Sequence, residues 1–368
     1  MQENMPIKKI VFVIPNLNQG GAERVLATLA NRFAKNGSEV SIITFDNGHS
    51  FYTLDQNISL VPLNTTTTGF SSSSINAIKR TRQYIKNIRK IKPDVIISFM
   101  DYPNVLCILW NFIVKQKLII AQRTDPVFGI LPSGFSTLRK LLYKKADAIV
   151  VQTERSIKIF EHIGVALPTI KSIIPNPLNE DCYNDNVLPP KENIILAVGR
   201  LSSEKQFDLL IDIFSKTEHK DWQLWIVGSG AEMDALQNKV NNLKLSENIK
   251  LLGAQKNIKQ YYQRSKIFAL TSRTEGYPNS LCEAMANGCA CISFDCDTGP
   301  GEIIKNDING LLIKNGNAFE FQKQLQSLMA DENKIAYLGF EALKIREALH
   351  IKNISEQWYN LMQTVVKK

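Results

Sequence analysis

The sequence has 368 residues, of which 44% are hydrophobic and 21% are charged. That length exceeds what one hydrophobic core usually covers, and the composition excludes a disordered or low-complexity chain. The net charge of +9 is uneven, because residues 1–185 hold 22 Lys and Arg against 14 Asp and Glu, whereas the remainder is nearly balanced. We therefore expect two globular domains, the first of which has an anionic partner.

Cysteine spacing and apolar segments indicate the compartment. The six cysteines include no C-x-x-C pair, which argues against zinc sites and disulfide frameworks. The apolar run at 10–14 is too short for a signal-peptide core, and the longest one, 105–114, is about half of the roughly 20 residues that a membrane span needs. These features predict a cytoplasmic protein with reduced, buried thiols, which can lie on the inner face of the cell membrane without crossing it.

Short β-branched runs alternate with amphipathic stretches along the first half of the chain, a pattern typical of parallel sheets with crossover helices. The predicted strands are 9–14, 39–45, 58–63, 94–99, 118–121, 146–151 and 170–174. The predicted helices are 22–35, 75–91, 102–114, 136–145 and 154–162.

The segment 175–193 contains four prolines and no periodicity, which is typical of an interdomain linker. Strands then begin again at 194–198, 223–227, 249–252, 267–270, 290–294 and 310–313, with helices in most gaps. The fold class is therefore α/β, with two Rossmann-like, doubly wound domains that we expect to face each other across a cleft. We place the first domain at 1–185, the second at 190–345, and a C-terminal helix that packs back on the first domain at 346–368.

The stretch 273–288, RTEGYPNSLCEAMANG, joins a strand to a helix through a loop rich in Gly, Pro and Asn. We expect the helix to begin near Ser280, with Ser280 as its N-cap and its first backbone N–H groups forming an anion site. Glu275 precedes the helix and Glu283 lies inside it, and a carboxylate there can accept paired hydrogen bonds from a ribose diol. The alternative is that Glu283 complements the helix dipole and Glu275 is a solvated loop residue.

A second strand, turn and helix occupies 197–214, AVGRLSSEKQFDLLIDIF, and its turn carries Arg200 and Lys205 where a diphosphate would need cations. The sequence G-R-L-x-x-E-K, followed by V-G-S-G at 227–230 and by E-G-x-P with E-x7-E, resembles the retaining GT-B glycosyltransferases of family 4. The resemblance covers both predicted domains in order.

That resemblance implies a role for each matching residue. Arg200 and Lys205 would bind the donor diphosphate, Glu283 would hold the ribose, and Glu275 would reach the transferred sugar. The reaction would retain the anomeric configuration without a metal or other cofactor, since the leaving phosphate takes the acceptor proton in a front-face displacement. Catalysis is thus assigned to Glu275, Arg200 and Lys205, and further donor contacts to Gly20, Gly21, Gly228, Gly276, Asn279, Ser280 and Leu281.

The first domain contributes a loop, NLNQGGAE at 16–23, whose glycines allow backbone to approach a ligand closely. It resembles the G-G-A-E loop of the same family, where the glycines border the donor phosphates and the acceptor. Many relatives also carry a His on a first-domain loop at the reaction centre, but the corresponding segment here is QRTDP at 122–126. Arg123 and Asp101 are our candidates for the acceptor or reaction centre in its place.

The triplet Asp295-Cys296-Asp297 spells D-x-D, a metal-and-diphosphate motif of the other large glycosyltransferase fold. That fold has a different layout with one sheet. The triplet here instead precedes TGPGE at 298–302, which corresponds to the Gly-rich segment beside the donor in family 4. We therefore expect the aspartates to shape a loop, and we expect no metal.

The helix predicted at 75–91 combines a row of Ile with Lys79, Arg80, Arg82, Lys86, Arg89 and Lys90, and a second basic cluster includes Arg139. One interpretation is a core-facing helix with a solvated cationic side. The other is docking on an anionic membrane surface, or contact with the diphosphate of a polyprenyl-diphosphate-linked saccharide acceptor. Both can hold at once.

Three classes of function remain in competition. The first is transfer of a sugar, with an N-acetylhexosamine from UDP as the leading candidate, to a lipid-linked saccharide in surface polysaccharide or glycan assembly. The second is a nucleotide-sugar epimerase or phosphorylase, which should show catalytic acids or a cofactor lysine that we do not identify. The third is a non-catalytic module that binds membrane or nucleic acid. The clustered motifs favour the transferase, with no nucleic-acid partner, and the missing glycine fingerprint disfavours an NAD dehydrogenase.

Overall fold

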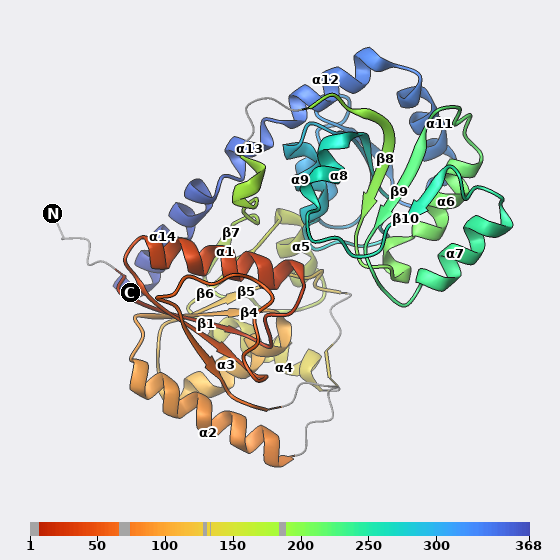
Figure 1. The fold of residues 1–368 in the computed structure, drawn as a ribbon. Coiled ribbons are helices and arrows are strands. Elements are labelled where there is room, and N and C mark those ends of the chain that lie inside the picture. Colours follow the sequence, from red (N-terminus) through yellow and green to blue (C-terminus); the bar gives the residue numbers. More distant parts are fainter. Residues whose placement is uncertain (1–6, 66–73, 128–130, 133, 184–188) are drawn as a thin grey trace. The chain divides into compact units, whose positions relative to one another are not determined.

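The computed structural model describes residues 7–65, 74–127, 131–132, 134–183 and 189–368 (Figure 1). The chain divides into two compact units, which we call unit 1 (Met1–Pro177 and Ile351–Lys368) and unit 2 (Leu178–His350). Of the predicted linker at 175–193, residues 184–188 lie outside the described residues. Its described part includes a 3-10 turn at Glu180–Cys182 and the start of a strand at Glu192.

Unit 1 is built on a sheet whose described strands all run parallel, in the order β3-β2-β1-β4-β5-β6-β7. Their bounds are β1 Lys9–Ile14, β2 Glu39–Thr44, β3 Ser59–Pro62, β4 Val95–Phe99, β5 Leu118–Ala121, β6 Ala148–Val151 and β7 Ile170–Ile173. The helices are α1 Gly21–Lys35, α2 Ser74–Ile91, α3 Asp101–Val114, α4 Phe135–Leu142, α5 Glu154–His162 and α14 Ile351–Lys367.

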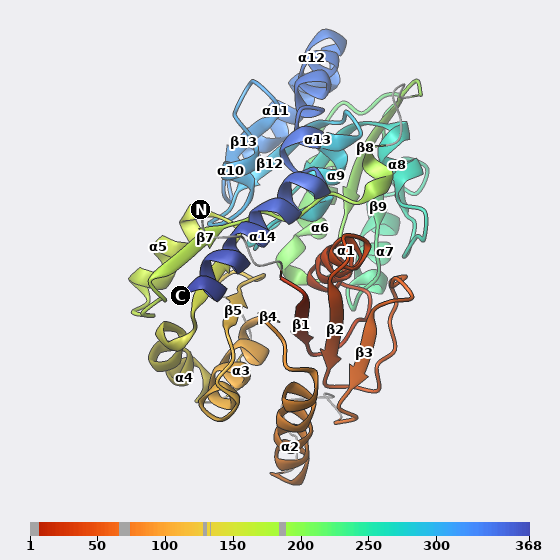
Figure 2. The same cartoon turned by 90° about the vertical axis from the view of Figure 1, so that its left-hand side faces the viewer.

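Both faces of this sheet are covered by helices. On one face, Tyr84 of α2 and Trp110 of α3 join a buried cluster with strand residues such as Ile120. On the other face, Phe12 packs against Phe33 of α1, while the C-terminal helix α14 lies beside the strands (Figure 2). Unit 1 therefore contains the last residues of the chain as part of its own core.

Unit 2 repeats the plan with a parallel sheet in the order β10-β9-β8-β11-β12-β13. Its strands are β8 Glu192–Val198, β9 Gln223–Val227, β10 Ile249–Leu251, β11 Ser265–Leu270, β12 Ala290–Asp295 and β13 Leu311–Lys314. Its helices are α6 Phe207–Ser215, α7 Met233–Asn242, α8 Lys259–Arg264, α9 Asn279–Ala286, α10 Pro300–Ile303, α11 Ala318–Met329, α12 Glu332–Ala342 and α13 Ile345–Ala348. Two buried clusters, one on each face, fix these helices to the sheet.

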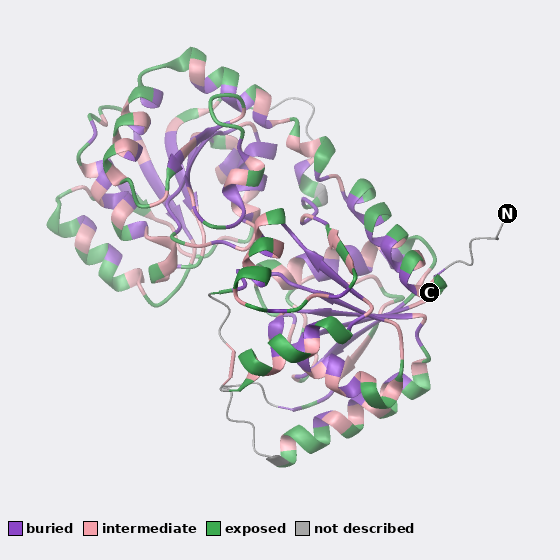
Figure 3. Cartoon of the chain, turned by 180° about the vertical axis from the view of Figure 1, so that it is seen from behind, coloured by how far each residue is buried: buried purple, intermediate pink, exposed green. Residues whose placement is uncertain are grey.

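The predicted α/β class with two Rossmann-like sheets is confirmed, and the central strands of both sheets are almost wholly buried (Figure 3). Strand ends differ from the predicted ones by one or two residues, and the predicted helix 136–145 divides into α4 and a 3-10 turn at Tyr143–Lys145. All six cysteines lie in described parts of the chain, where each is buried and none forms a disulfide. No helix among the described residues is long and apolar enough to cross a membrane.

The order of strands reverses direction between β1 and β4 in unit 1, and between β8 and β11 in unit 2. Ligands of doubly wound sheets bind outside the carboxyl ends of strands at such a switch point. In unit 2 those ends lead into the loop containing Arg200 and the loop containing Glu275. In unit 1 they lead into the loop containing Gly20 and the turn at Asp101.

Candidate active site

Two glycine-containing loops of unit 2 touch through their backbones at the ends of β8 and β9. A Cβ on Gly228, whose φ is +151°, would lie 1.8 Å from the carbonyl oxygen of Gly199, and a Cβ on Gly230 would lie 2.2 Å from that of Leu201. The Leu201 N–H donates to the Ser229 carbonyl at 2.9 Å. The glycines are therefore required for packing, and this contact fixes the loop that carries Arg200 and Lys205.

The same loop holds Lys205 against Glu275, the first acidic residue of the E-x7-E motif. The Lys205 Nζ lies 2.7 Å from Glu275 Oε1, and the Ser272 hydroxyl donates to that same oxygen at 2.6 Å. The Thr298 hydroxyl donates to the Glu275 backbone carbonyl. Glu275 is buried. The Lys205 ammonium and the Ser272 hydroxyl hold its side chain in place, and the Thr298 hydroxyl holds its backbone.

Backbone contacts join the Lys205 loop to the segment that follows β11. The Arg273 N–H donates to the Glu204 carbonyl at 2.8 Å, and the Thr271 hydroxyl donates to the Lys205 carbonyl at 3.1 Å. Gln206, with φ +51°, occupies the left-handed region directly before α6, a conformation that L-residues adopt at a cost. The Lys205 side chain is thus directed by a strained turn that neighbouring segments hold in place. Arg200 lies exposed on the same loop.

Helix α9 begins one residue earlier than predicted, at Asn279, and its N-cap is Pro278. The predicted N-cap Ser280 is wrong: it lies in the first turn, because the Pro278 carbonyl accepts the N–H groups of Leu281 and Cys282 at 3.1 and 3.2 Å. No side chain caps this end of the helix. The first amides of a helix have no intrahelical acceptor, so this end is suited to bind an anion.

Glu283, the second acidic residue of the motif, lies in α9 and is 6% exposed. The phenol of Tyr262 in α8 donates to Glu283 Oε2 at 3.0 Å. Burial of a carboxylate is costly unless hydrogen-bond donors replace the water that it loses. A residue from another helix therefore fixes the orientation of the Glu283 carboxylate.

The D-x-D triplet ends β12 beside Glu275. Burial, and then the negative charge of Glu275, raise the pKa of Cys296 to about 12, so its thiol is neutral at physiological pH. Among the described residues, no group of three or more His, Cys, Asp or Glu side chains is placed to hold a metal ion. Gly299 follows with φ +93°, and a Cβ there would lie 2.6 Å from Pro278 Cδ, so this loop packs against the start of α9.

In unit 1, the predicted glycines precede and begin α1. The Tyr52 hydroxyl donates to the Gly20 carbonyl at 2.7 Å and lies 2.9 Å from the Gly20 nitrogen. A Cβ on Gly20 would lie 2.1 Å from a carboxylate oxygen of Glu23. A side chain at Gly20 would therefore displace the end of the flexible Glu23 side chain, and Gly21 is the first residue of the helix.

Asp101 is buried at the start of α3, after Met100 with φ +77°. Its Oδ1 accepts from Arg139 Nη1 at 3.1 Å and from the Tyr143 hydroxyl at 2.9 Å. Its Oδ2 accepts from Gln122 Nε2 at 2.7 Å and from the Thr124 hydroxyl at 3.2 Å. This carboxylate therefore organises the 122–124 segment. Arg139, which the sequence grouped with a basic surface cluster, is instead its buried partner.

Arg123 is also buried, and it lies between aromatic rings. Its guanidinium is 4.7 Å from the Phe99 ring centre and 5.3 Å from that of Trp358 in α14. Nη1 donates to Asn176 Oδ1 at 2.9 Å, while Nε and Nη2 have no acceptor among the described residues. Burial lowers the pKa of Arg123 to about 9. The guanidinium is thus still charged at neutral pH, although its buried surroundings disfavour the charged form.

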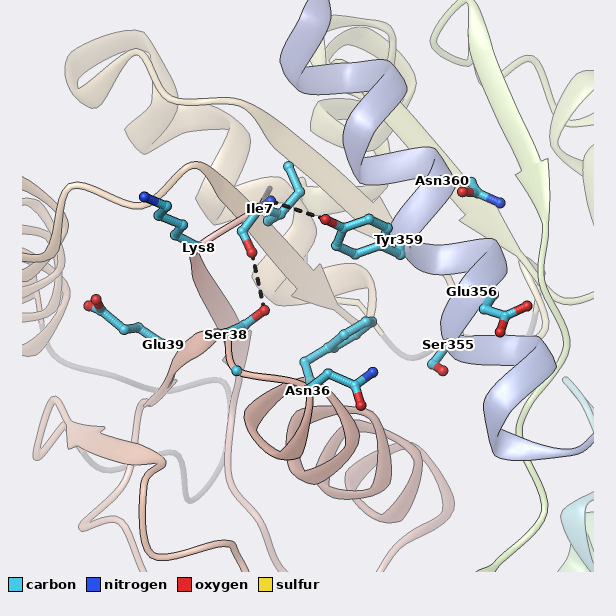
Figure 4. A pocket seen from close by; sticks show the side chains of 11 residues that line it. Ile7, Lys8, Asn36, Ser38, Glu39, Ser355, Glu356, Tyr359 and Asn360 are labelled. Atoms are coloured by element: carbon cyan, nitrogen blue, oxygen red, sulfur yellow. Dashed lines mark hydrogen bonds between the residues drawn. The ribbon is translucent and has the colours of Figure 1, made fainter. Parts of the chain in front are cut away.

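A separate hollow in unit 1, of about 670 Å³, lies at the amino ends of β1 and β2, between α1 and α14 (Figure 4). Lys8, Glu39, Glu356 and Tyr359 are among its lining residues, and the Tyr359 hydroxyl accepts the Ile7 N–H at 3.3 Å. It opens at the end of the sheet opposite the carboxyl ends of the strands. It therefore takes no part in the arrangement that surrounds Asp101 and Gly20.

Several residues that support the candidate site residues could not be identified from the sequence. Ser272 and Tyr262 hold the two motif carboxylates, yet one resembles an ordinary loop serine and the other a core aromatic residue. Trp358 lies more than 200 residues from Arg123 in the sequence and reaches it only because α14 belongs to unit 1. The periodicity of the sequence could have marked Tyr262 and Trp358 as buried, but not their partners.

Comparisons with known proteins identify the family. Residues 19–181 match the model of Glycosyltransferase Family 4, and residues 180–344 match that of Glycosyl transferases group 1. The chain is 30% identical, over 97% of its own length and 99% of the relative's, to the GalNAc-alpha-(1->4)-GalNAc-alpha-(1->3)-diNAcBac-PP-undecaprenol alpha-1,4-N-acetyl-D-galactosaminyltransferase of Campylobacter jejuni. It is 31% identical to the amylovoran biosynthesis glycosyltransferase AmsD of Erwinia amylovora, over 88% of this chain and 91% of that one.

Solved structures agree on the fold. The chain superposes on Anabaena HepE, crystallised in complex with UDP, with a TM-score of 0.84 and 18% identity over 97% of this chain and 100% of that one. The lipopolysaccharide outer core galactosyltransferase WaaB gives a TM-score of 0.75 and 21% identity over 96% and 98% of the two chains. Family and fold together favour the transferase over the epimerase, phosphorylase and binding-module alternatives. The chain therefore belongs to glycosyltransferase family 4 and is a glycosyltransferase with the GT-B fold.

Proposed function

We propose that this enzyme is a retaining, metal-independent hexosyltransferase that moves a sugar from a UDP-sugar to a saccharide acceptor. The observation that carries the proposal is the 2.7 Å pair of Lys205 and Glu275, held beside the first turn of α9 at the carboxyl ends of β8 and β11. A cation, a carboxylate and a helix N-terminus at one sheet edge form a site for a diphosphate and the sugar that it carries.

In this proposal each residue at the carboxyl ends of the unit 2 strands has one role. Arg200 and Lys205 neutralise the diphosphate, the amides of Asn279 and Ser280 donate to it, and Leu281 lies beside it. Gly228 and Gly276 let backbone approach the donor, and Glu283 accepts the ribose hydroxyls. Glu275 contacts the transferred sugar. In unit 1, Gly20 and Gly21 allow a similar backbone approach at the end of β1, while Asp101 and Arg123 are buried enough to act by positioning the 122–124 segment.

The proposed reaction forms one bond and breaks one. The acceptor oxygen bonds to the anomeric carbon on the face from which the phosphate leaves, and the bond between that carbon and the phosphate oxygen breaks. The acceptor proton passes to the departing phosphate oxygen. The cations stabilise the charge that grows on the nucleoside diphosphate, which is the electrostatic contribution expected of a preorganised site.

Relatives support the identity of donor and acceptor. The Campylobacter enzyme is named for transfer of N-acetylgalactosamine to an undecaprenyl-diphosphate-linked saccharide, and the Erwinia enzyme for amylovoran biosynthesis. HepE was crystallised with UDP. We therefore propose a UDP-N-acetylhexosamine donor, a polyprenyl-diphosphate-linked saccharide acceptor, and a role in surface polysaccharide or glycan assembly.

The test is donor hydrolysis by the purified protein with a panel of UDP-, GDP- and ADP-sugars, with and without EDTA. Glu275→Ala and Lys205→Ala serve as the site variants. We expect release of UDP from one donor, unchanged by EDTA and lost in both variants. NMR of the free sugar, recorded before it mutarotates, should show the α anomer first from an α-linked donor. No release and no nucleotide binding by the wild type would overturn the proposal, and inversion of configuration would overturn the retaining mechanism.

Helix α2 is the proposed contact with the membrane. Lys79, Arg82, Lys86, Arg89 and Lys90 are exposed on it, and so are Ile75 and Ile78, at 76% and 53%. Arg80 departs from the predicted basic face, because it is buried between Thr65, Tyr102 and the Phe45 ring. Exposed Ile beside a row of cations is the pattern of a helix that lies on an anionic bilayer.

Cosedimentation with vesicles tests this contact. The protein should bind vesicles that contain phosphatidylglycerol and not neutral ones, and the variant Ile75→Ser with Ile78→Ser should bind several-fold more weakly. Equal binding of that variant and the wild type would exclude α2 as the contact.

A further inference from the structure

The carboxylates of the E-x7-E motif do not set their own orientation, since residues outside the motif hydrogen-bond to both. For Glu283 that residue is Tyr262 of α8, whose hydroxyl donates to Oε2 at 3.0 Å. Glu283 and Tyr262 lie 21 residues apart, on two helices that follow different strands. The bond is therefore a tertiary contact, which the local geometry of α9 does not impose.

Tyr262 is a rigid donor. Its side chain is 1% exposed, and its ring packs beside Phe268 with the ring centres 6.1 Å apart. Leu281 and Met285 of α9 belong to the same buried cluster. The ring therefore has no room for another rotamer, and its hydroxyl stays at one point beneath the carboxylate.

The backbone of Tyr262 is fixed as well. Its carbonyl accepts from Lys191 Nζ at 3.0 Å and from Cys289 Sγ at 3.2 Å. The same two groups also donate to the Ser265 carbonyl, at 2.9 and 3.3 Å. These bonds satisfy the carbonyls at the end of the short helix α8, and so the position of the Tyr262 phenol is set from both ends of the residue.

We infer that Tyr262 is a positioning residue for nucleotide recognition, which orients the Glu283 carboxylate toward the hydroxyls of the donor ribose. The inference rests on the proposed function, which gives Glu283 that task. With one oxygen fixed by the phenol, the carboxylate has a single orientation and binds a diol without losing rotational freedom. Removal of the phenol oxygen leaves the carboxylate and its charge in place but frees its orientation.

The experiment compares two ligands in each of four proteins. UDP and 2′,3′-dideoxyuridine diphosphate differ only in the ribose hydroxyls, and their Kd values are measured by calorimetry for the wild type, Tyr262→Phe, Glu283→Gln and Tyr261→Phe. Tyr261 is the matched control, since its ring packs against Trp225 and it has no bond to the motif. Because both ligands are tested on one sample, the ratio of their Kd values is independent of the fraction folded.

We expect Tyr262→Phe to weaken UDP about tenfold, as loss of one hydrogen bond to a charged group would, and to leave the dideoxy ligand unchanged. Glu283→Gln should give the same pattern, and Tyr261→Phe should match the wild type. Equal weakening of both ligands by Tyr262→Phe, or unchanged UDP binding, would overturn the inference. A wild type that binds both ligands equally would instead overturn the ribose role of Glu283 in the proposed function.

Discussion

The Lys205 ammonium and the Glu275 carboxylate form a partly buried ion pair, with Nζ and Oε1 2.7 Å apart, at the carboxyl edge of the second sheet. Nothing in the spacing of the sequence requires them to meet, since 70 residues separate them. Their meeting unites the two motifs that the sequence presents separately. The pair also implies that Lys205 holds Glu275 in place before any diphosphate arrives.

Substitution at this pair should damage turnover more than stability. Glu275→Gln keeps the shape of the side chain and an acceptor for Ser272, and we expect kcat to fall by about 10²–10³, the usual loss on removing one electrostatic contact to a transition state. The thermal midpoint should change by no more than a few degrees. Steady-state kinetics and calorimetry check this, with Glu247→Gln, at an exposed position, as a surface control. A Glu275→Gln protein that is strongly destabilised, yet has the kcat of the wild type when folded, would contradict this prediction.

Gly228 should be far less tolerant than another glycine with positive φ. Gly228→Ala places a methyl group 1.8 Å from the Gly199 carbonyl oxygen, whereas Gly253→Ala, at φ +65°, meets no atom within 4 Å. We expect about 1 kcal/mol of destabilisation from backbone strain at Gly253 and several kcal/mol at Gly228. Urea unfolding measures both. Similar losses at the two positions would show that the loop can move away.

Asp101 should prove essential to the stability of unit 1. Asp101→Ala leaves Arg139 buried without its carboxylate, a change that typically costs about 3–5 kcal/mol. The double variant Asp101→Leu with Arg139→Met should lose less than the sum of the single variants, since neither charge is then left alone. Denaturant unfolding of the wild type, Asp101→Leu, Arg139→Met and the double variant checks the coupling. Loss of activity at unchanged stability in Asp101→Ala would instead place this residue at the reaction centre.

Replacement of Arg123, unlike that of Asp101, should increase the stability of the fold. Its folded pKa of about 9 lies below the ordinary value, so the unfolded chain binds the proton more tightly. Below about pH 9 the buried charge therefore lowers the free energy of unfolding by its full amount. This loss decreases as the pH rises above that value, because the folded protein then releases the proton. We expect Arg123→Met to be more stable than the wild type at pH 7, by at least about 1 kcal/mol, with reduced turnover.

The pH dependence separates charge from packing at this position. The stability difference between Arg123→Met and the wild type should narrow between pH 8 and pH 10.5, because only the wild type releases the Arg123 proton. Other titrating groups are common to both proteins and cancel in the difference. A stability difference that stays constant over this range would mean that it arises from the change in side-chain volume and not from the Arg123 charge.

Strand and helix positions were predictable here because buried parallel strands appear as continuous apolar runs between amphipathic segments. The runs at 9–14 and 223–227 coincide with β1 and β9. The motif loops were predictable because Gly, Pro and paired charges at strand ends have few other uses. By contrast, helical periodicity does not distinguish the buried Arg80 from the exposed Lys79, because only the tertiary partners Thr65 and Tyr102 mark the difference.

The same limit applies to the supports of the site. Ser280 was a reasonable N-cap by residue type, yet the Pro278 carbonyl sets the start of α9 one residue earlier. Ser272 and Tyr262 become meaningful only when their hydroxyls are seen beside Glu275 and Glu283. Residue identity indicates which groups can react, whereas the groups that hold them depend on contacts between distant segments.

The membership of α14 in unit 1 has a consequence for biosynthesis. Unit 2 is one continuous stretch and can fold before α14 is synthesised, but the core of unit 1 includes Trp358 of α14. The first part to be synthesised is therefore the last to be completed, and until α14 follows, the face of unit 1 that contains Phe99 is open to chaperones.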